Sequence, residues 1–300
     1  MRAMVYTRYG PPDVLHLADI EKPVPRRHEV LIRVRATTVS AADVRCRGFR
    51  VPLTFWIPAR LALGILTPRR SILGGELAGD IEEVGTDVVR FKNGDQVFAE
   101  TLMRPGAYAE YTCLPETGVI ALKPTNMTYE EAAAVPIGAR AALHFLRKAN
   151  VASGQRVLVY GASGSVGTFA VQLAKHFGAH VTAVCSGSNL ELVESLGADA
   201  AIDYTTERFA ARGDAYDVVF VAVNRCAFAD CMKALKEHGI YLNVTAPIRT
   251  PRMWWVSLTS HKAIVTGELA EEYADDLVFL RSLIERHQLR AVIDRRYPLE

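Results

Sequence analysis

The sequence predicts an α/β protein made of two parts of different kinds. Residues 1–122 hold short alternating segments that are broken by glycine and proline. From residue 130 onward, apolar strand patterns alternate with helical patterns, which is typical of a parallel sheet with crossover helices. A glycine-rich stretch also stands directly between one buried strand and the helix that follows it.

The N-terminal part reads as an antiparallel, β-rich structure. Val30–Arg35 alternates strictly between apolar and polar residues, so we expect a strand with one solvent-facing side. Leu77–Val84 and Ala107–Cys113 have similar patterns. Asn93-Gly94-Asp95 is turn chemistry between two strands.

The C-terminal part begins with helical spacing over Glu130–Lys148. The pattern change near Leu122-Lys123-Pro124 marks the domain boundary. We then expect, in chain order, strand Val157–Tyr160, helix Val166–Phe177, strand Val181–Val184, helix Leu190–Leu196, strand Ala200–Ile202, strand Val218–Val221, helix Phe228–Leu235 and strand Tyr241–Val244.

Composition excludes several classes of protein. A net charge of +2 and the lack of a Lys/Arg-rich run give no electrostatic case for binding nucleic acid. The sequence has neither an apolar N-terminal leader nor a run of about 18 apolar residues, so we expect no secretory signal and no membrane span. Its five cysteines form no C-x-x-C pair, which predicts a reducing, cytoplasmic location without a disulfide framework or a zinc knuckle.

The glycine-rich stretch has the spacing of a dinucleotide-binding fingerprint, with Ala162 in the place of the first glycine. Gly164 would let the backbone approach a pyrophosphate, and Gly167 would let the helix pack closely on the strand. Free N–H groups at the start of the helix would attract the phosphates. A plain tight turn is the alternative. The predicted binding residues of this loop are Ala162, Ser163, Gly164, Ser165, Val166 and Gly167.

The end of the next strand predicts which nucleotide is bound. Cys185 takes the position where a carboxylate would hold the ribose of NAD, and the neutral donors Ser186 and Asn189 follow it. Lys175 on the preceding helix would add positive charge near a 2′-phosphate. These residues favour NADPH over NADH, although a solvated loop that accepts both cofactors explains them too.

Six segments spread along the chain carry a family resemblance: "GPPDVLHLADIEKPVPRRHEVLIRV", "LGGELAGDIEEVGTDVVRFKNGDQVFA", "GAYAEY", "YEEAAAVPIGARAALHFL", "VLVYGASGSVGTFAVQLAK" and "SLGADAAIDYTTE". In their order and spacing the chain resembles the medium-chain dehydrogenase/reductase superfamily, and within it the zinc-independent quinone oxidoreductase-like branch. The resemblance implies a GroES-like catalytic domain (1–122 and 289–300, with its C-terminal end incomplete) and a doubly wound Rossmann domain (123–288). It also implies that Tyr204 packs near the adenosine 2′-phosphate.

At least two of the three catalytic zinc ligands of related dehydrogenases are missing from this chain. Ser40 stands where they have a cysteine three residues before an aspartate, and Gly75 replaces the histidine of Gly-His-Glu. Residues 94–111 contain no cysteine for a structural zinc lobe. Because catalytic zinc needs three protein ligands, we expect no metal site.

Without zinc, the predicted chemistry is hydride transfer from NADPH to a quinone or an α,β-unsaturated carbonyl. Ser40, Asp43 and Arg45 are the candidate catalytic residues. Capping of a turn explains Asp43 equally well, and Arg45 is also explained as an exposed side chain. Asn224, after the fourth strand of the Rossmann part, would either hydrogen-bond the nicotinamide ribose or narrow the pocket.

Other readings stay open. The apolar stretch Pro52–Leu66 is either a lid over a hydrophobic substrate, a buried packing segment or a membrane-surface contact interrupted by Pro58 and Gly64.

The segment Lys262–Leu269 offers a sheet edge for a homodimer, with Trp254 and Trp255 as anchors; tryptophans that line the cleft or fill the core are the alternative. A nucleotide-binding sensor or scaffold, or an alcohol dehydrogenase-type enzyme, is the alternative function.

Overall fold

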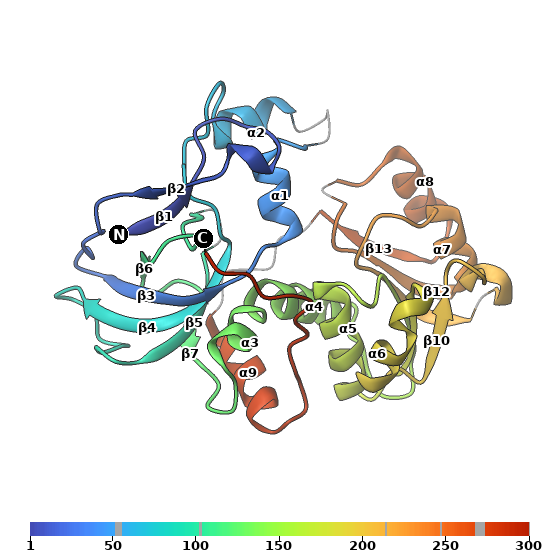
Figure 1. Ribbon diagram of the computed structural model, residues 1–300. Helices are drawn as coiled ribbons and strands as arrows, with labels where there is room; N and C mark the ends of the chain where they lie inside the picture. Colours follow the sequence, from blue (N-terminus) through green and yellow to red (C-terminus); the bar gives the residue numbers. More distant parts are fainter. Residues whose placement is uncertain (52–55, 102–103, 214, 247, 268–273, 300) are drawn as a thin grey trace. The chain divides into compact units, whose positions relative to one another are not determined.

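The computed structural model describes residues 1–51, 56–101, 104–213, 215–246, 248–267 and 274–299 of the 300-residue chain (Figure 1). Its contacts divide the chain into two compact units. Unit 1 comprises Met1–Ile137, Glu272–Glu285 and Ile293–Glu300, and unit 2 comprises Gly138–Glu271 and Arg286–Val292. The domain limits expected from the sequence, 1–122 with 289–300 and 123–288, stay a prediction.

Unit 1 contains the expected antiparallel β-structure. Its five-stranded sheet has the order β6-β3-β4-β5-β7, and every neighbouring pair is antiparallel. A separate antiparallel pair joins β1 to β2. The strands are β1 (Arg2–Val5), β2 (His16–Asp19), β3 (Glu29–Thr37), β4 (Glu76–Val84), β5 (Gln96–Glu100), β6 (Tyr111–Pro115) and β7 (Ile120–Leu122).

The alternation expected over Val30–Arg35 holds only in part. Val30, Leu31 and Ile32 are all buried, while Arg33 and Arg35 are exposed. The pairing of β3 with β4 shifts between Leu31 and Ile32. The extra residue at this shift, Glu82, lies on β4.

The helices of unit 1 correct one expectation. The single helix expected over Glu130–Lys148 is two helices separated before Pro136, because a proline inside a helix lacks the N–H group that the helical ladder needs. Pro136 instead begins the second helix, where the missing N–H group costs nothing. The helices are α1 (Ala41–Arg47), α2 (Trp56–Leu63), α3 (Tyr129–Ala133), α9 (Ala274–Glu285), the one-turn 3-10 helix η1 (Pro12–Val14), and α4 (Pro136–Lys148), which crosses the unit limit after Ile137.

Part of the apolar stretch Pro52–Leu66 forms α2, and its residues 52–55 lie outside the described part of the chain. Helix α2 contains Pro58 in its first turn and ends before Gly64. None of its residues is buried, so the buried packing segment is not what forms here. The Arg60 guanidinium lies 3.8 Å from the ring centre of Phe49, a cation–π contact that holds the helix to unit 1.

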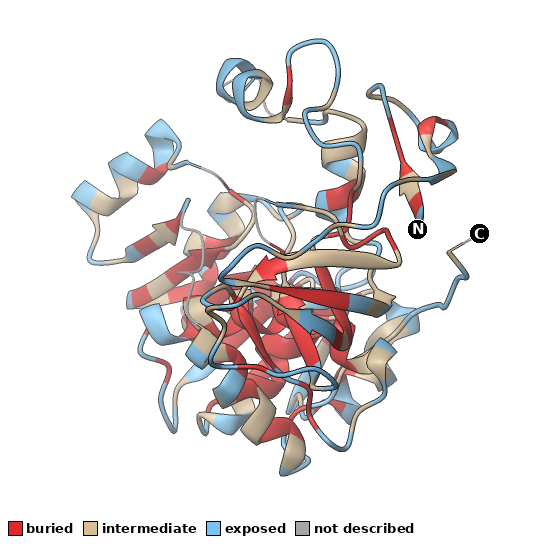
Figure 2. Ribbon diagram, turned by 90° about the vertical axis from the view of Figure 1, so that its left-hand side faces the viewer, coloured by how far each residue is buried: buried red, intermediate tan, exposed pale blue. Residues whose placement is uncertain are grey.

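Unit 2 is a doubly wound α/β structure. Its six strands are all parallel and have the order β10-β9-β8-β11-β12-β13, so the fold class expected from the sequence is confirmed. Figure 2 shows buried residues concentrated in the strands of the sheets. The elements are β8 (Arg156–Tyr160), α5 (Ser165–His176), β9 (His180–Cys185), η3 (Gly187–Asn189), α6 (Leu190–Ser195), β10 (Ala200–Asp203), η4 (Phe209–Arg212), β11 (Tyr216–Val221), α7 (Phe228–Ala234), β12 (Leu235–Asn243), α8 (Pro251–Thr259) and β13 (Ala263–Thr266).

The chain beyond β12 is held by one buried side chain. Asn243 is fully buried at the last position of β12. Its Oδ1 accepts hydrogen bonds from the backbone N–H groups of Thr245 and Ala246, both at 3.0 Å, and from the Thr245 hydroxyl at 3.1 Å. Its Nδ2 donates to the hydroxyl of Tyr241 at 2.9 Å. The turn after β12 therefore depends on the Asn243 amide.

Replacing this amide should destabilise unit 2. We expect Asn243→Ala to lower the free energy of unfolding by ~2–4 kcal/mol, because two backbone donors lose their acceptor in or beside the core. Chemical denaturation followed by circular dichroism measures the loss. Thr245→Val is the matched control, since it removes one hydroxyl bond and keeps both backbone bonds. Equal losses in the two variants would contradict this account of the turn.

Candidate active site

The glycine-rich loop lies where the strand order of unit 2 reverses. Strand β8 pairs with β9 on one side and with β11 on the other. Gly161, the first residue after β8, has φ +79°, and a Cβ atom on it would come within 2.5 Å of Val223 Cγ1 in the loop after β11. In open α/β sheets, ligands bind at this reversal point, beyond the carboxyl ends of the strands.

A second glycine of the loop, Gly167, lets the helix pack closely on the strand. A Cβ atom on Gly167 would lie 2.1 Å from the carbonyl oxygen of Gly161, so only glycine allows α5 to approach β8 this closely. Ala162, which the sequence places in the first glycine's position, is fully buried. The left-handed turn is made by Gly161 instead, a residue that the fingerprint alignment missed although it directly follows a buried strand.

The start of helix α5 is built to receive an anion. Gly164 is its N-cap, and no side chain caps the helix. A Cβ atom on Gly164 would touch nothing closer than the Gly161 carbonyl oxygen at 3.5 Å, so the chain's own packing does not require glycine there. The first N–H groups of a helix have no partner inside the helix, and they point toward bound phosphates in dinucleotide sites. The loop therefore fits the pyrophosphate of a dinucleotide.

Polar side chains from two further segments meet this loop. Asn189 Nδ2 donates to the hydroxyls of Ser186 at 2.9 Å and Ser163 at 3.4 Å. Tyr204 is half exposed, its backbone N–H bonds the carbonyl of Cys185, and its ring centre lies 6.4 Å from that of Tyr160. The structure thus brings together four of the predicted cofactor residues beyond the carboxyl ends of β8, β9 and β10. They are Ser163, Ser186, Asn189 and Tyr204.

Lys175 does not belong to this group. It stands in the last turn of α5, at the opposite end of the helix from Gly164. Its ammonium group bonds both carboxylate oxygens of Asp199, at 2.8 and 2.9 Å. Asp199 also accepts the backbone N–H of Val181 at the beginning of β9. We therefore correct the prediction that Lys175 supplies charge to the cofactor. Its position in the last turn of α5 and its ion pair with Asp199 hold it near the amino end of β9, away from the glycine loop.

One carboxylate near the loop was missed. Asp203, the last residue of β10, accepts hydrogen bonds from the N–H and hydroxyl of Thr205 at 2.9 and 2.8 Å. A Cβ atom on Gly187 would lie 2.6 Å from Asp203 Oδ2. The hydrogen bonds from Thr205 lower the pKa of Asp203, which is therefore ionised at neutral pH. Parallel pairing of β9 with β10 places Asp203 opposite Cys185, a neighbour that the sequence around the end of β9 does not contain.

The segment with the candidate catalytic residues forms a capped helix in unit 1. Ser40 is the N-cap of α1, and its hydroxyl donates to Asp43 Oδ2 at 2.6 Å. The other Asp43 oxygen accepts the backbone N–H of Gly74 at 3.0 Å. Asp43 therefore holds the helix start and the Gly74 backbone together, and Arg45 is exposed on α1.

A second buried carboxylate stands beside this segment. Glu76 is 3% exposed at the start of β4. Its oxygens accept hydrogen bonds from the Thr38 hydroxyl at 2.6 Å and from the backbone N–H of Ile137 at 2.8 Å. Burial raises the pKa of Glu76 to about 7, against the lowering effect of these two hydrogen bonds.

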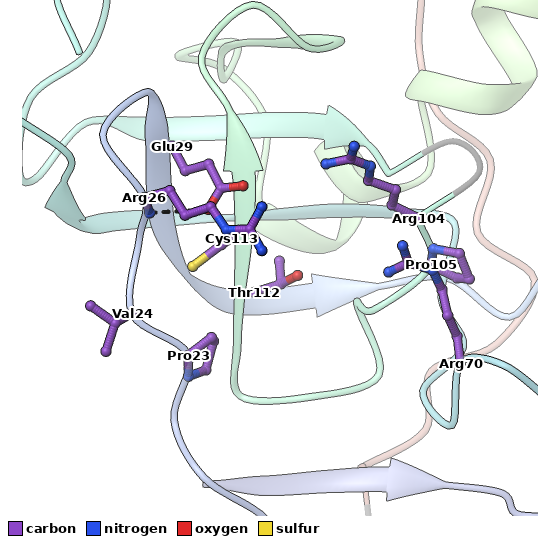
Figure 3. Close-up of a pocket in the computed structure, with 9 residues that line it drawn as sticks. All are labelled: Pro23, Val24, Arg26, Glu29, Arg70, Arg104, Pro105, Thr112 and Cys113. Atoms are coloured by element: carbon purple, nitrogen blue, oxygen red, sulfur yellow. Dashed lines mark hydrogen bonds between the residues drawn. The ribbon is translucent and has the colours of Figure 1, made fainter. Parts of the chain in front are cut away.

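A pocket of about 310 Å³ elsewhere in unit 1 has no predicted site residue in its wall (Figure 3). Burial raises the pKa of the Cys113 thiol in this wall to about 11, so that thiol is neutral near pH 7. The pocket is lined by Pro23, Val24, Arg26, Glu29, Arg70, Arg104, Pro105, Thr112 and Cys113.

Within the described part of the chain, no group of three or more His, Cys, Asp or Glu side chains could hold a metal ion. Over the same residues, no helix has the length and apolarity needed to cross a bilayer.

Comparisons with known proteins agree with this geometry. Residues 26–124 match the model of the alcohol dehydrogenase GroES-like domain, and residues 196–300 match that of zinc-binding dehydrogenases. The chain is 35% identical over 308 residues to 2-methylene-furan-3-one reductase of Solanum lycopersicum, an alignment that covers 99% of this chain and 72% of the relative. The chain belongs to the medium-chain dehydrogenase/reductase superfamily.

Other relatives place this medium-chain reductase in the quinone oxidoreductase-like branch. It is 34% identical to an NADPH-dependent alkenal/one oxidoreductase of Arabidopsis thaliana, covering 99% of the chain and 73% of the relative. It is 32% identical to a quinone-oxidoreductase homolog of Spinacia oleracea, covering 100% and 92%. The structure of the quinone oxidoreductase from Coxiella burnetii superposes with a TM-score of 0.86 at 29% identity, covering 100% and 92%. The family and the oxidoreductase class expected from the sequence are confirmed.

The expected cytoplasmic location is wrong. The Arabidopsis and spinach relatives are both named as chloroplastic, which is a location other than the cytoplasm. The expectation rested on free, sparse cysteines, and all five cysteines are indeed free. Free thiols indicate a reducing compartment only, and they do not distinguish one reducing compartment from another.

The buried Glu76 carboxyl should make stability depend on pH. Its folded-state pKa of about 7 lies above the ordinary value of 4.5, so its stabilising contribution is complete below pH 4.5 and is lost as pH rises through 7. We expect the free energy of unfolding to fall by ~3 kcal/mol over this range.

Urea unfolding at several pH values between 4.5 and 8 tests this expectation. Glu76→Gln keeps the shape of the side chain and should remove most of the slope. The matched control is Glu110→Gln, because the pKa of Glu110 is lowered by hydrogen bonds from Arg2 and its loss should leave the slope in place. A Glu76→Gln variant with the wild-type slope would contradict the assignment.

Proposed function

We propose that this medium-chain reductase transfers hydride from NADPH to α,β-unsaturated carbonyls or quinones. The observation that carries the proposal is the glycine loop at the reversal point of the sheet, with an uncapped helix N-terminus beside it. The names of the tomato, Arabidopsis and spinach relatives support the substrate class.

In this proposal the chain's own groups orient the cofactor. The N–H groups of Ser165 and Val166 and the open side of Gly164 receive the pyrophosphate. Ser163, Ser186, Asn189 and Tyr204 surround the adenosine end, and Asn224, which is exposed in the loop after β11, faces the nicotinamide ribose. When bound, NADPH supplies the hydride. Ala162 and Gly167 shape the loop through packing.

We still propose NADPH over NADH, but without a contribution from Lys175. Lys175 does not contribute, and ionised Asp203 beside Gly187 opposes a 2′-phosphate. The neutral donors Ser186 and Asn189 and the NADPH dependence in the name of the Arabidopsis relative favour NADPH. NADH binding with lower affinity is compatible with the same loop.

We propose that the reaction uses no zinc, because two ligand positions lack donor side chains. Gly75 has no side chain, and the Ser40 hydroxyl donates to Asp43 within the helix cap. Ser40 remains our candidate for polarising a substrate oxygen. Its one hydroxyl proton is donated to Asp43 Oδ2, so this role requires the hydroxyl to turn from Asp43 to the substrate. We assign Asp43 as a positioning residue for Ser40 and leave Arg45 as an exposed cation on the same helix.

We also propose that the chain forms a homodimer through the edge of the parallel sheet. β13 is the edge strand, and Trp254 and Trp255 on α8 are 55% and 69% exposed. Residues 268 and 269 of the expected segment Lys262–Leu269 lie outside the described part of the chain. The Arg249 guanidinium bonds the Ile264 carbonyl at 2.6 Å and would have to move for a second strand to pair there. Light scattering at micromolar concentration tests the proposal, since the mass of one chain would reject it.

A substrate panel tests the reaction. We expect quinones and enones, but not saturated aldehydes, to oxidise NADPH, followed by the loss of its absorbance. We expect no reduction of NADP⁺ by simple alcohols, followed by the gain of the same absorbance. Tight NADPH binding without turnover on any substrate would favour the sensor or scaffold. Turnover of simple alcohols that requires stoichiometric zinc would favour an alcohol dehydrogenase.

Gly164→Val tests the cofactor loop. We expect this variant to fold, because the position has open space, and to lose NADPH binding, because a branched side chain would occupy the approach of the pyrophosphate. Fluorescence titration with NADPH measures binding, and a thermal melt confirms folding. Gly164→Ala should show a smaller loss. Wild-type affinity in Gly164→Val would mean that the dinucleotide lies elsewhere.

Ser186→Asp tests the preference for NADPH. A second carboxylate at the end of β9 should weaken NADPH by ~1–3 kcal/mol through repulsion of the 2′-phosphate and loss of a hydrogen bond, with a smaller effect on NADH. Ser186→Ala is the control for loss of the hydroxyl alone. Equal dissociation constants of NADPH and NADH in the wild type would contradict the preference itself.

A further inference from the structure

Two thiols of unit 2 are in direct contact outside the cofactor loop. The Sγ atoms of Cys226 and Cys231 lie 3.5 Å apart and share a hydrogen bond. Cys231 is fully buried in α7, whereas Cys226 is partly exposed in the segment that precedes the helix. The proposed hydride transfer uses neither thiol.

The contact is set by the backbone of α7. Ala227 is the N-cap of this helix, so Cys226 stands immediately before the cap and Cys231 on the fourth helical residue. Side chains at these two positions face each other across the first turn, where many helices place a pair of apolar residues. A disulfide needs its sulfurs about 2.05 Å apart, so the two sulfurs must approach from 3.5 Å to form the bond.

The two thiols differ in reactivity. The hydrogen bond with Cys231 lowers the pKa of Cys226. That same hydrogen bond and burial raise the pKa of Cys231. Cys226 is therefore the better thiolate and the more accessible nucleophile, while Cys231 is placed to attack it from the buried side.

The segment just before Cys226 touches the candidate dinucleotide loop. The backbone N–H of Ala222 bonds the carbonyl of Tyr160, the last residue of β8, at 2.9 Å. Val223 stands against Gly161, where a Cβ atom would come within 2.5 Å of it. The chain has only Asn224 and Arg225 between this contact and the thiol. A movement of Cys226 toward α7 would therefore pull on Ala222 and Val223, the residues that contact the dinucleotide loop.

We propose that Cys226 and Cys231 are a redox-active dithiol that glutathione disulfide oxidises to an intramolecular disulfide, and that this disulfide weakens dinucleotide binding. The formation of the disulfide is independent of the proposed function, whereas its effect on binding rests on it.

The reaction consists of two thiol–disulfide exchanges. The Cys226 thiolate attacks one sulfur of glutathione disulfide, whose S–S bond breaks, and one glutathione leaves. Cys231 then loses its proton and attacks Cys226 Sγ, and the second glutathione leaves. The protein loses two electrons and two protons, and glutathione disulfide gains them as two glutathione thiols.

The first experiment measures the bond itself. The full chain is incubated in glutathione buffers from reduced to oxidised, then alkylated, digested and analysed by mass spectrometry. We expect a Cys226–Cys231 linkage, with the protein mass lower by two hydrogen atoms, and reversal by dithiothreitol. Cys226→Ala and Cys231→Ala should not form it, and Cys113→Ala should form it like the wild type. A persistent glutathione adduct on Cys226, or a linkage through other cysteines, would overturn the proposal.

The second experiment measures NADPH affinity of the reduced and oxidised forms by fluorescence titration. We expect at least about a fivefold weaker affinity after oxidation, the lower end of usual couplings between sites. Cys226→Ala should show the same affinity in both buffers, and because its thiol is partly exposed this variant should fold even if Cys231→Ala does not. Unchanged affinity in an oxidised wild type that carries the disulfide would overturn the link to binding. Absence of NADPH binding by the reduced wild type would reject the proposed function instead, while the mass measurement would still decide the disulfide.

Discussion

The close approach of α5 to the end of β8 is the contact on which unit 2 depends. Gly167 lies so near the Gly161 carbonyl that a single added carbon would overlap it at 2.1 Å. This contact aims the N-terminus of α5 at the space beyond β8. Because β8 is also where the sheet order reverses, the same space lies between the loops after β8 and β11. In our proposal, helix packing and dinucleotide binding use the same backbone, which explains why small residues run through the whole loop.

Unit 1 uses two carboxylates for a different purpose. Asp43 joins the start of α1 to Gly74, and Glu76 joins Thr38 to the backbone of Ile137. The family resemblance implies metal ligands of zinc-dependent relatives at the positions of Ser40 and Gly75, and we propose that this chain uses none there. Hydrogen bonds to buried carboxylates hold the strand and helix ends in this region. Because burial disfavours the ionised form of a carboxyl group, the pKa of Glu76 is raised to about 7.

The loop after β11 connects three features of unit 2. It follows a central strand, it packs against Gly161 through Val223, and it ends at the Cys226–Cys231 contact. In our proposal, oxidation of this thiol pair acts on the dinucleotide loop through this one short segment of chain.

The sequence by itself determined the class of each part and the position of the glycine-rich loop that we propose as the dinucleotide site. Alternation of apolar residues, the order of strands and helices, and a glycine pattern between Val157 and Gly167 are local signals, and local signals survive in the sequence. The two helices that replace Glu130–Lys148 were also readable, since Pro136 cannot donate the backbone hydrogen bond that a single helix would need.

The tertiary structure decided which side chains share an edge. Lys175 and Gly164 belong to one helix, but its length separates them, and Asp199 holds the lysine at the far end. Asp203 is remote from Ser186 in the sequence and becomes its neighbour through parallel pairing of β10 with β9. Gly161 took the role assigned to Ala162 because only the packed loop shows which backbone turns left-handed. Contacts of this kind arise from pairing and packing between distant segments, and no local pattern in the sequence encodes them.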